Sequence, residues 1–204
     1  AQDTNLLTPM DVAKIQNVTG VQLSEDGSLL AFTRSVPADP TQENKPASTH
    51  LFIHNVATGQ TVPFYTRGSV RDVAFRPGQA SITFLAKLDG DKTTALYEMP
   101  LTGGEASRIF SFDTSLSSYE WSADGRRLAF IAPEPQKEEK DKLPYEPIIY
   151  EENLTYARAY LVDMTTDEKS PERLQLDGDV NSLAWNPNGK MLAVMAAPTP
   201  LVDD

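Results

Sequence analysis

A short sequence pattern occurs three times in this chain and a fourth time in a weaker form. Each copy has an apolar residue, a polar turn and a second apolar run, and the copies begin at Leu23, Phe75, Trp121 and Trp185. The turn contains Asp-Gly or Asn-Gly in every copy except the weaker one at Phe75. The intervals of 52, 46 and 64 residues are typical of repeats that must pack on their neighbours to bury an apolar face, as in propellers and solenoids.

Each copy predicts a β-hairpin, because Asp-Gly and Asn-Gly between apolar runs favour turns with positive φ. A third strand with alternating apolar residues is expected at 51–56, 95–99 and 159–164, and a fourth at 61–65, 107–110 and 173–176. Four antiparallel strands per repeat make a propeller blade. The last copy has no third or fourth strand after Met195. We therefore predict an all-β fold with three complete blades and half of a fourth.

The expected organisation is an N-terminal segment, 1–17, followed by a partial β-propeller over 18–204. Thr8 and Pro9 suit the N-cap and first position of a short helix in that first segment. We place the blades at about 18–68, 69–115, 116–178 and 179–204. Because a closed propeller needs at least four blades, the sequence is interpreted as the N-terminal portion of a longer protein.

Two polar, proline-containing insertions, at 36–48 and 133–147, occupy the same place between the second and third strands of their blades. Insertions in repeat proteins map to one face, which is often the binding face. This corner of the blades is therefore where contacts with other molecules are expected.

Composition excludes several classes of function. The net charge of −11 disfavours nonspecific binding to nucleic acid or anionic lipid, which depends on Lys and Arg. No cysteine is present, so disulfides, thiolate metal sites and a cysteine nucleophile are excluded. The first residues, Ala-Gln-Asp-Thr-Asn, are similar to those that follow a signal-peptide cleavage site, although an engineered start would look the same. We expect a periplasmic or secreted protein.

The segment from Leu7 to Asp11, Leu-Thr-Pro-x-Asp, followed by blades of the form Ser-x-Asp-Gly-x-x-Leu-Ala-Phe, resembles the start of the propeller in the prolyl oligopeptidase family of serine peptidases. The likeness is to the dipeptidyl aminopeptidase and acylaminoacyl peptidase types and extends from Leu6 to about Met195. The blade motif alone is shared with TolB-like periplasmic propellers. The resemblance implies a seven- or eight-bladed propeller that covers a C-terminal α/β-hydrolase domain and admits only short peptides.

In that family the chemistry belongs to a Ser-His-Asp triad in the hydrolase domain. This sequence has no Gly-x-Ser-x-Gly, and its only histidines are His50 and His54. We therefore expect no catalytic residue, no cofactor and no metal site in this chain. The two histidines are four residues apart on one predicted strand, and no further metal ligands are indicated near them.

The candidate substrate-binding residues are Glu151 and Glu152, with Tyr150 and Arg158 nearby. Dipeptidyl peptidases of the family use a paired glutamate on the propeller to bind the substrate's terminal ammonium, which suits two converging carboxylates. In the family, however, that pair comes shortly before a blade hairpin, whereas here it precedes a third strand. A solvated acidic turn therefore remains the alternative.

The tryptophans Trp121 and Trp185 are interpreted as core residues between blades, because Leu23 and Phe75 occupy the equivalent positions. The expected function is access control in a secreted serine exopeptidase that acts on peptide substrates in its full-length form, without nucleic acid or membrane partners. The alternatives are a non-catalytic TolB-like scaffold and a self-contained interaction domain. The incomplete blade, residues 180–195, is expected to permit self-association.

Overall fold

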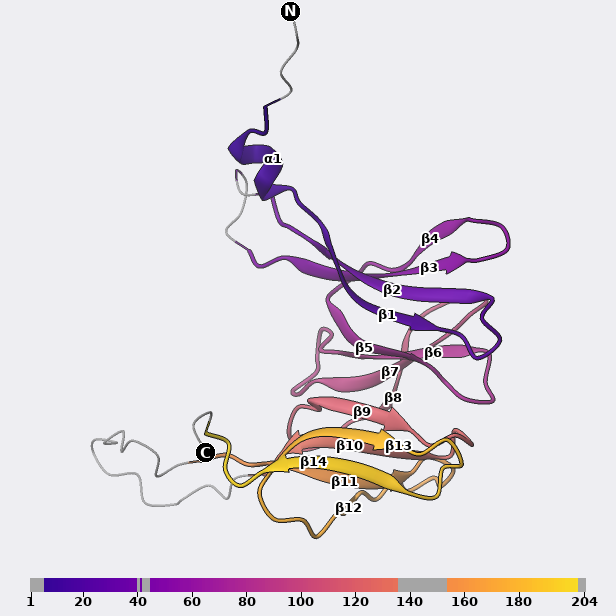
Figure 1. Cartoon of the computed structure of the whole chain (residues 1–204), viewed down its shortest axis with the longest axis vertical. Helices are drawn as coiled ribbons and strands as arrows, with labels where there is room; N and C mark the ends of the chain where they lie inside the picture. The colour runs from indigo at the N-terminus through magenta and orange to yellow at the C-terminus, as the bar shows by residue number, and fades with distance from the viewer. Residues whose placement is uncertain (1–5, 40, 42–44, 136–153, 202–204) are drawn as a thin grey trace, which may run out of the picture. The chain divides into compact units, whose positions relative to one another are not determined.

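The computed structural model describes residues 6–39, 41, 45–135 and 154–201, and Figure 1 shows that their regular secondary structure is almost entirely β-strand. Three sheets have four strands and one has two, and consecutive strands are neighbours in every sheet. Every strand register that is defined is antiparallel. The predicted fold class is confirmed: the described chain has three four-stranded blades and half of a fourth. The total number of blades stays a prediction.

The strands have the following bounds. The first sheet contains β1 (Asn17–Leu23), β2 (Leu29–Val36), β3 (Ser48–Asn55) and β4 (Thr61–Tyr65), and the second contains β5 (Val70–Phe75), β6 (Ser81–Ala86), β7 (Ala95–Pro100) and β8 (Ser107–Phe110). The third contains β9 (Ser118–Trp121), β10 (Arg127–Pro133), β11 (Ala157–Asp163) and β12 (Glu172–Arg173), and the fourth contains β13 (Asp179–Trp185) and β14 (Leu192–Ala197).

The repeated turn motif forms by the same hydrogen bonds in different copies. The Asp26 carboxylate accepts from the Ser24 hydroxyl at 2.7 Å and from the Ser28 backbone N–H at 3.0 Å. Ser122 and Asp124 form the equivalent 2.5 Å bond in the third sheet. These bonds lower the pKa of Asp26 to about 2, the Ser24 hydroxyl being the largest cause. In the motif only the glycine has positive φ, as at Gly27, Gly125 and Gly189.

Contacts between Cα atoms divide the chain into two compact units. Unit 1 consists of residues 1–75, 80–89 and 97–107, and unit 2 of residues 76–79, 90–96 and 108–204. In unit 1 the core contains Leu51, Ile82, Phe84 and Leu85, all fully buried. The rings of Tyr65 and Tyr97 pack on Phe84 with centroid distances of 5.1 and 6.2 Å.

The core of unit 2 is an aromatic cluster in the third sheet with an aliphatic layer beside it. Phe130 is completely buried and its ring lies 5.1 Å from those of Phe110 and Tyr160. The aliphatic layer joins the third sheet to the fourth through Ala129, Ile131, Ala159, Val180 and Leu183. Since side chains from both sheets share this layer, the two-stranded sheet is held by packing on its neighbour.

The tryptophans lie between sheets, as predicted. Trp121 is 7% exposed and packs under the guanidinium of Arg76 at 4.5 Å. Trp185 packs under Arg127 at 4.9 Å and donates its indole N–H to the Glu120 carbonyl. Leu23 occupies the equivalent position in the first sheet but is 58% exposed. It is not buried between sheets, because no sheet precedes the first one among the described residues.

The N-terminal helix, α1 (Pro9–Ala13), has the predicted capping residue. The Thr8 hydroxyl accepts from the Asp11 backbone N–H, and the Asp11 carboxylate accepts from the Thr8 backbone N–H. This reciprocal pair is a capping box, which satisfies donors at the start of the helix. No helix in the described residues is long and apolar enough to cross a membrane.

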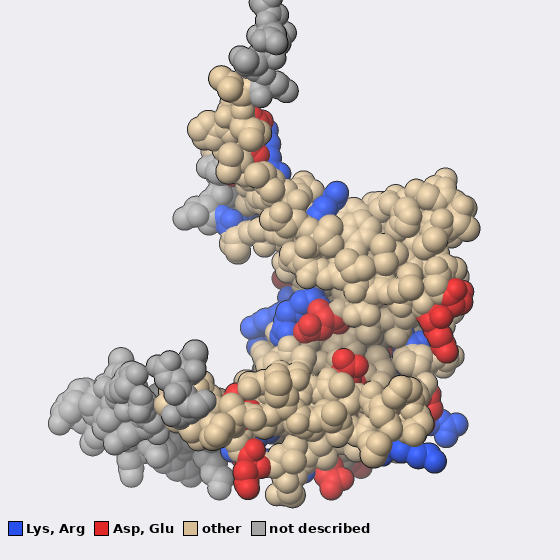
Figure 2. Space-filling model, viewed as in Figure 1, with Lys and Arg blue, Asp and Glu red and all other residues tan. Residues whose placement is uncertain are grey.

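Charged side chains of both signs appear on the face drawn in Figure 2, where Lys and Arg lie in small groups with Asp and Glu close by. A nucleic-acid surface needs many cations along one face, because each neutralises a phosphate. The described residues on this face do not form such a continuous basic surface.

Candidate functional site at the root of the long insertion

The long insertion of the third sheet leaves β10 at Pro133 and returns at Ala157, the first residue of β11. These two residues are register partners, and the Glu134 backbone N–H donates to the Tyr156 carbonyl at 2.9 Å. Both ends of the insertion therefore lie side by side. The candidate substrate-binding residues Glu151 and Glu152, with Tyr150, lie outside the described residues, so their role stays a prediction.

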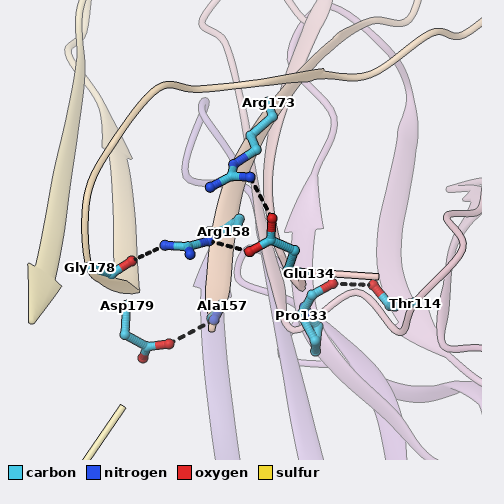
Figure 3. A network of polar contacts seen from close by, with 8 residues as sticks. All are labelled: Thr114, Pro133, Glu134, Ala157, Arg158, Arg173, Gly178 and Asp179. Carbon is cyan, nitrogen blue, oxygen red and sulfur yellow. Dashed lines mark hydrogen bonds and ion pairs between the residues drawn. The ribbon is translucent and has the colours of Figure 1, made fainter. Parts of the chain in front are cut away.

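A charged network occupies this root (Figure 3). The Glu134 carboxylate lies between two guanidinium groups, accepting from Arg158 Nε at 2.9 Å through one oxygen and from Arg173 through the other. Arg158 also donates to the Gly178 carbonyl at 2.5 Å, and its guanidinium lies 4.6 Å from the centre of the Tyr156 ring. Arg158 thus connects β11 to the start of the insertion and to the turn before β13.

Two further hydrogen bonds fix the backbone around the network. The carboxylate of Asp179, which is 9% exposed, accepts from the Ala157 backbone N–H at 2.7 Å. The Thr114 hydroxyl donates to the Pro133 carbonyl at 2.6 Å. Residues from three other parts of unit 2 therefore hold the two ends of one insertion: Thr114, Arg173 and the pair Gly178 and Asp179.

The electrostatics of the network favour an ionised Glu134. The hydrogen bond from Arg158 is the largest cause and lowers the pKa of Glu134. Burial, the second largest, raises this pKa, and the charges of both arginines lower it further, so that the net shift is downward. The Arg158 side chain is 14% exposed, whereas those of Glu134 and Arg173 are 39% and 37% exposed. Solvent therefore screens the Arg173 pair more than the Arg158 pair.

Because the folded-state pKa of Glu134 is lowered, its ionisation stabilises the folded state. We expect this contribution to be complete above the carboxyl's ordinary pKa of 4.5, and to be lost as the pH falls through the lower folded-state value. Glu134→Gln should therefore destabilise the protein at neutral pH, and the difference from the wild type should shrink in acid. Urea unfolding from pH 7 down to pH 3 measures this difference.

Glu172→Gln is the matched control, since Glu172 is exposed on β12 next to Arg173. It should change stability little at any of these pH values. If Glu134→Gln shows the same small change, or a loss that stays constant from neutral to acid pH, the network does not stabilise the fold through the charge of Glu134.

Sequence reasoning noticed Arg158 but missed Glu134 and Arg173. Glu134 lies in a Pro-Glu-Pro sequence that looks like any solvated insertion, and Arg173 is 39 residues away along the chain. His50 and His54 both lie on β3, as predicted, and the His54 ring is 2.8 Å from the Thr61 hydroxyl. The described residues contain no cluster of three or more His, Cys, Asp or Glu side chains able to hold a metal ion.

The four sheets, each made of consecutive antiparallel strands, define the class of this fold: the chain is built from β-propeller blades. Comparison with solved structures agrees. Acylaminoacyl peptidase from Pyrococcus horikoshii superposes with a TM-score of 0.62 at 14% identity, over 91% of this chain and 28% of that one. TolB from Acinetobacter baumannii gives a TM-score of 0.57 at 15% identity, over 87% of this chain and 40% of that one.

No family model matches the sequence. Among curated proteins, the uncharacterized peptidase YuxL of Bacillus subtilis is 28% identical over 212 residues. The alignment covers 94% of this chain but only 31% of that relative, so the chain spans about a third of its length. These likenesses confirm the predicted resemblance to the propeller portion of prolyl oligopeptidase-family peptidases.

Proposed function

We propose that this chain is the N-terminal propeller portion of a secreted serine exopeptidase-like hydrolase. In this proposal it limits the access of peptides to an α/β-hydrolase active site elsewhere in a longer protein. That protein is periplasmic or secreted, and this chain contributes the N-terminal segment, 1–17, and the partial propeller, 18–204. The observation that carries the proposal is the 28% identity, over 94% of this chain, to a protein named as a peptidase. The propeller fold supports it, because propellers stack rigid sheets that can present loops from one side.

The charged network supports a binding role for the long insertion. Glu134 and Arg158 fix the points where the insertion leaves and rejoins the third sheet. Functional loops are commonly positioned by a rigid scaffold of this kind. The insertion carries Glu151 and Glu152, which we propose as the acidic pair that binds the terminal ammonium of a peptide.

This assignment predicts a selective loss of affinity. Replacing Glu151 and Glu152 together with glutamine in the longer protein should raise KM for peptides with a free N-terminus by about 10- to 100-fold, because charge-assisted hydrogen bonds are lost. Peptides with an acetylated N-terminus should be unaffected, since they present no ammonium group. Steady-state kinetics on the two substrate forms measures the difference.

The exposed acidic residues Asp167 and Glu168, in the turn after β11, provide the matched control. Their replacement by Asn and Gln should change neither KM value. If the Glu151 and Glu152 changes affect both substrate forms equally, or affect neither, the pair does not bind the ammonium. The interpretation as a solvated acidic turn would then hold.

Access control is tested by substrate size. The longer protein should hydrolyse a short chromogenic peptide, but not the same sequence placed in a loop of a folded protein. Cleavage of both substrates at similar kcat/KM would contradict an access-limiting propeller while leaving the peptidase assignment intact.

A non-catalytic TolB-like scaffold is the second candidate, favoured by the superposition on TolB over 87% of this chain. It predicts that the longer protein hydrolyses no peptide and binds other proteins instead. The same hydrolysis assay therefore separates the two candidates.

A further inference from the structure

The apolar residues of β1 are exposed, whereas their equivalents in the other sheets are buried. Val18 and Val21 lie five and two residues before the repeat position at the end of β1 and are 58% and 55% exposed. The residues at the same two places in the other sheets are all at most 9% exposed: Val70 and Val73, Leu116 and Tyr119, Val180 and Leu183. The helix α1 does not cover Val18 and Val21, since none of its residues is buried.

A neighbouring sheet covers the equivalent residues where both partners belong to one unit. In unit 1, β5 packs against β1, β2 and β3, and Val70 and Val73 line one space with Ala31 of the first sheet. In unit 2, β13 packs against β9, β10 and β11, and Val180 and Leu183 join the aliphatic layer of the third sheet. The contact between a first strand and another sheet therefore recurs in this fold, and β1 has the apolar residues for it without the sheet.

The backbone of β1 is also shaped like that of the covered strands. The register of β1 on β2 shifts between Val18 and Gly20, and that of β13 on β14 shifts at the equivalent place, between Val180 and Ser182. β5 has a bulge as well, which contains Asp72, the one non-glycine residue with positive φ in the described chain. Bulges re-aim the side chains of a strand. The irregularity of β1 is thus the one found in strands that pack on another sheet.

One cation lies among these apolar side chains. Val21 is opposite Phe32 in the strand register and Val18 is opposite Arg34, and directly opposite residues share a face of the sheet. We call these four residues the β1 face. The Arg34 guanidinium lies 4.2 Å from the centre of the Phe52 ring, which stacks on Phe32. Its Nε is buried without a hydrogen-bond partner, and Arg34 forms no ion pair within the described residues.

The third sheet shows what a guanidinium at this level of a sheet binds when it is covered. The equivalent of Arg34 there is Ala132, and its register partner Arg158 carries the guanidinium. Arg158 is 14% exposed and bonds the Glu134 carboxylate and the Gly178 carbonyl. A guanidinium that loses water without gaining an acceptor is a buried unpaired charge, which is strongly destabilising. Covering the β1 face therefore requires an acceptor for Arg34, and a carboxylate matches a guanidinium in charge and geometry.

We propose that the β1 face is the docking surface for another propeller sheet of the longer protein, outside residues 1–204, and that this sheet supplies a carboxylate to Arg34. A sheet suits this face better than a flexible peptide, because sheets cover the equivalent residues within this chain. The curated relative is long enough to hold further sheets, since the alignment covers only 31% of it. The inference rests on the proposed function in one respect, namely that this chain belongs to a longer propeller protein.

Labelling of an introduced thiol tests the docking. Val21→Cys is made in this chain, which has no cysteine of its own, and in the longer protein. A thiol reagent should modify position 21 rapidly in this chain and at least about 100-fold more slowly in the longer protein, because the docked sheet must first open. Val56→Cys is the matched control, since Val56 is 53% exposed in the turn after β3. It should react at similar rates in both proteins, and peptide mass spectrometry reads each position separately.

Changes of Arg34 in the longer protein that carries Val21→Cys test the carboxylate. Arg34→Met removes the charge and leaves the partner carboxylate buried and unpaired, so labelling of position 21 should accelerate by at least about tenfold. Arg34→Lys keeps the charge but loses the bidentate geometry, and should accelerate labelling less. Arg67→Met is the matched control, because Arg67 forms an exposed ion pair with Glu105 in the same unit. It should leave the labelling rate unchanged.

Three results would overturn the proposal. The first is equal labelling of position 21 in this chain and in the longer protein. The second is a labelling rate in this chain that falls as its concentration rises, which would assign the β1 face to a second copy. The third is an unchanged or slower rate for Arg34→Met in a variant that circular dichroism shows to be folded. Labelling of position 21 does not depend on peptide hydrolysis, so the failure of this site and that of the proposed function are distinguishable.

Discussion

Replacing Phe130 with alanine is expected to lower the free energy of unfolding by about 3–5 kcal/mol. Phe130 is completely buried at the centre of the aromatic cluster of unit 2. Its ring packs on Phe110, Phe112 and Tyr160, with centroid distances of 5.1, 5.3 and 5.1 Å. Alanine removes the ring and leaves a cavity that close-packed neighbours cannot fully fill. Urea unfolding of the variant and the wild type measures the loss.

Phe130→Leu keeps much of the volume and should cost less than the alanine variant. Met191→Ala is the surface control, because Met191 is 66% exposed, and it should change stability by no more than about 0.5 kcal/mol. A loss for Phe130→Ala as small as that for Met191→Ala would show that this cluster is not the core of unit 2.

Gly125→Ala should destabilise the protein strongly, with an expected loss of about 3 kcal/mol or more. Gly125 has φ +65°, which alanine adopts only at a cost. In addition, a Cβ at this position would lie 2.3 Å from the Pro77 carbonyl oxygen. Either the turn of the third sheet or the backbone at Pro77 would have to move.

Gly78→Ala separates these two causes. Gly78 occupies the equivalent turn of the second sheet with φ +70°, and a Cβ there would meet no atom within 4 Å. This variant should therefore show the conformational cost alone, about 1–2 kcal/mol. Equal losses for the two variants in urea unfolding would mean that the close approach of the Pro77 carbonyl adds no cost to the substitution of Gly125.

Much of the fold could be predicted because it is encoded locally and repeated. The bounds of β4 and β8 match the predicted strands, since alternating apolar residues and flanking turns define both ends. The turn of the repeat also keeps its hydrogen bonds when a different polar residue occupies the same position. In the fourth sheet the Asn186 side chain accepts from the Met191 backbone N–H, the role that Ser122 has for Arg127 in the third sheet.

The fourth strand of the third sheet was less predictable. β12 has two residues, Glu172 and Arg173, whereas a longer strand at 173–176 was expected. The Arg173 side chain belongs to the charged network. Only Glu172 and Arg173 pair with β11, opposite Leu161 and Tyr160, so the strand is too short to show an alternating pattern.

The candidate sites could not be predicted, because they depend on contacts between residues far apart in the chain. Glu134 meets Arg158 and Arg173 only when the third sheet has formed. Positive φ is usually predicted at glycine, so the sequence did not indicate it at Asp72. The bulge that contains Asp72 is visible only in the pairing of β5 with β6. A single sequence indicates the strands, but it does not indicate which polar side chains their pairing brings together.

The central proposal is that this chain is the propeller portion of a serine peptidase, and active-site labelling tests it most directly. A fluorophosphonate probe reacts with a serine that an adjacent base activates. We predict that the longer protein is labelled at one serine, and that mass spectrometry places this serine outside residues 1–204, while this chain alone is unlabelled. Stoichiometric labelling of a serine within residues 1–204, or no labelling of a folded longer protein, would contradict the account.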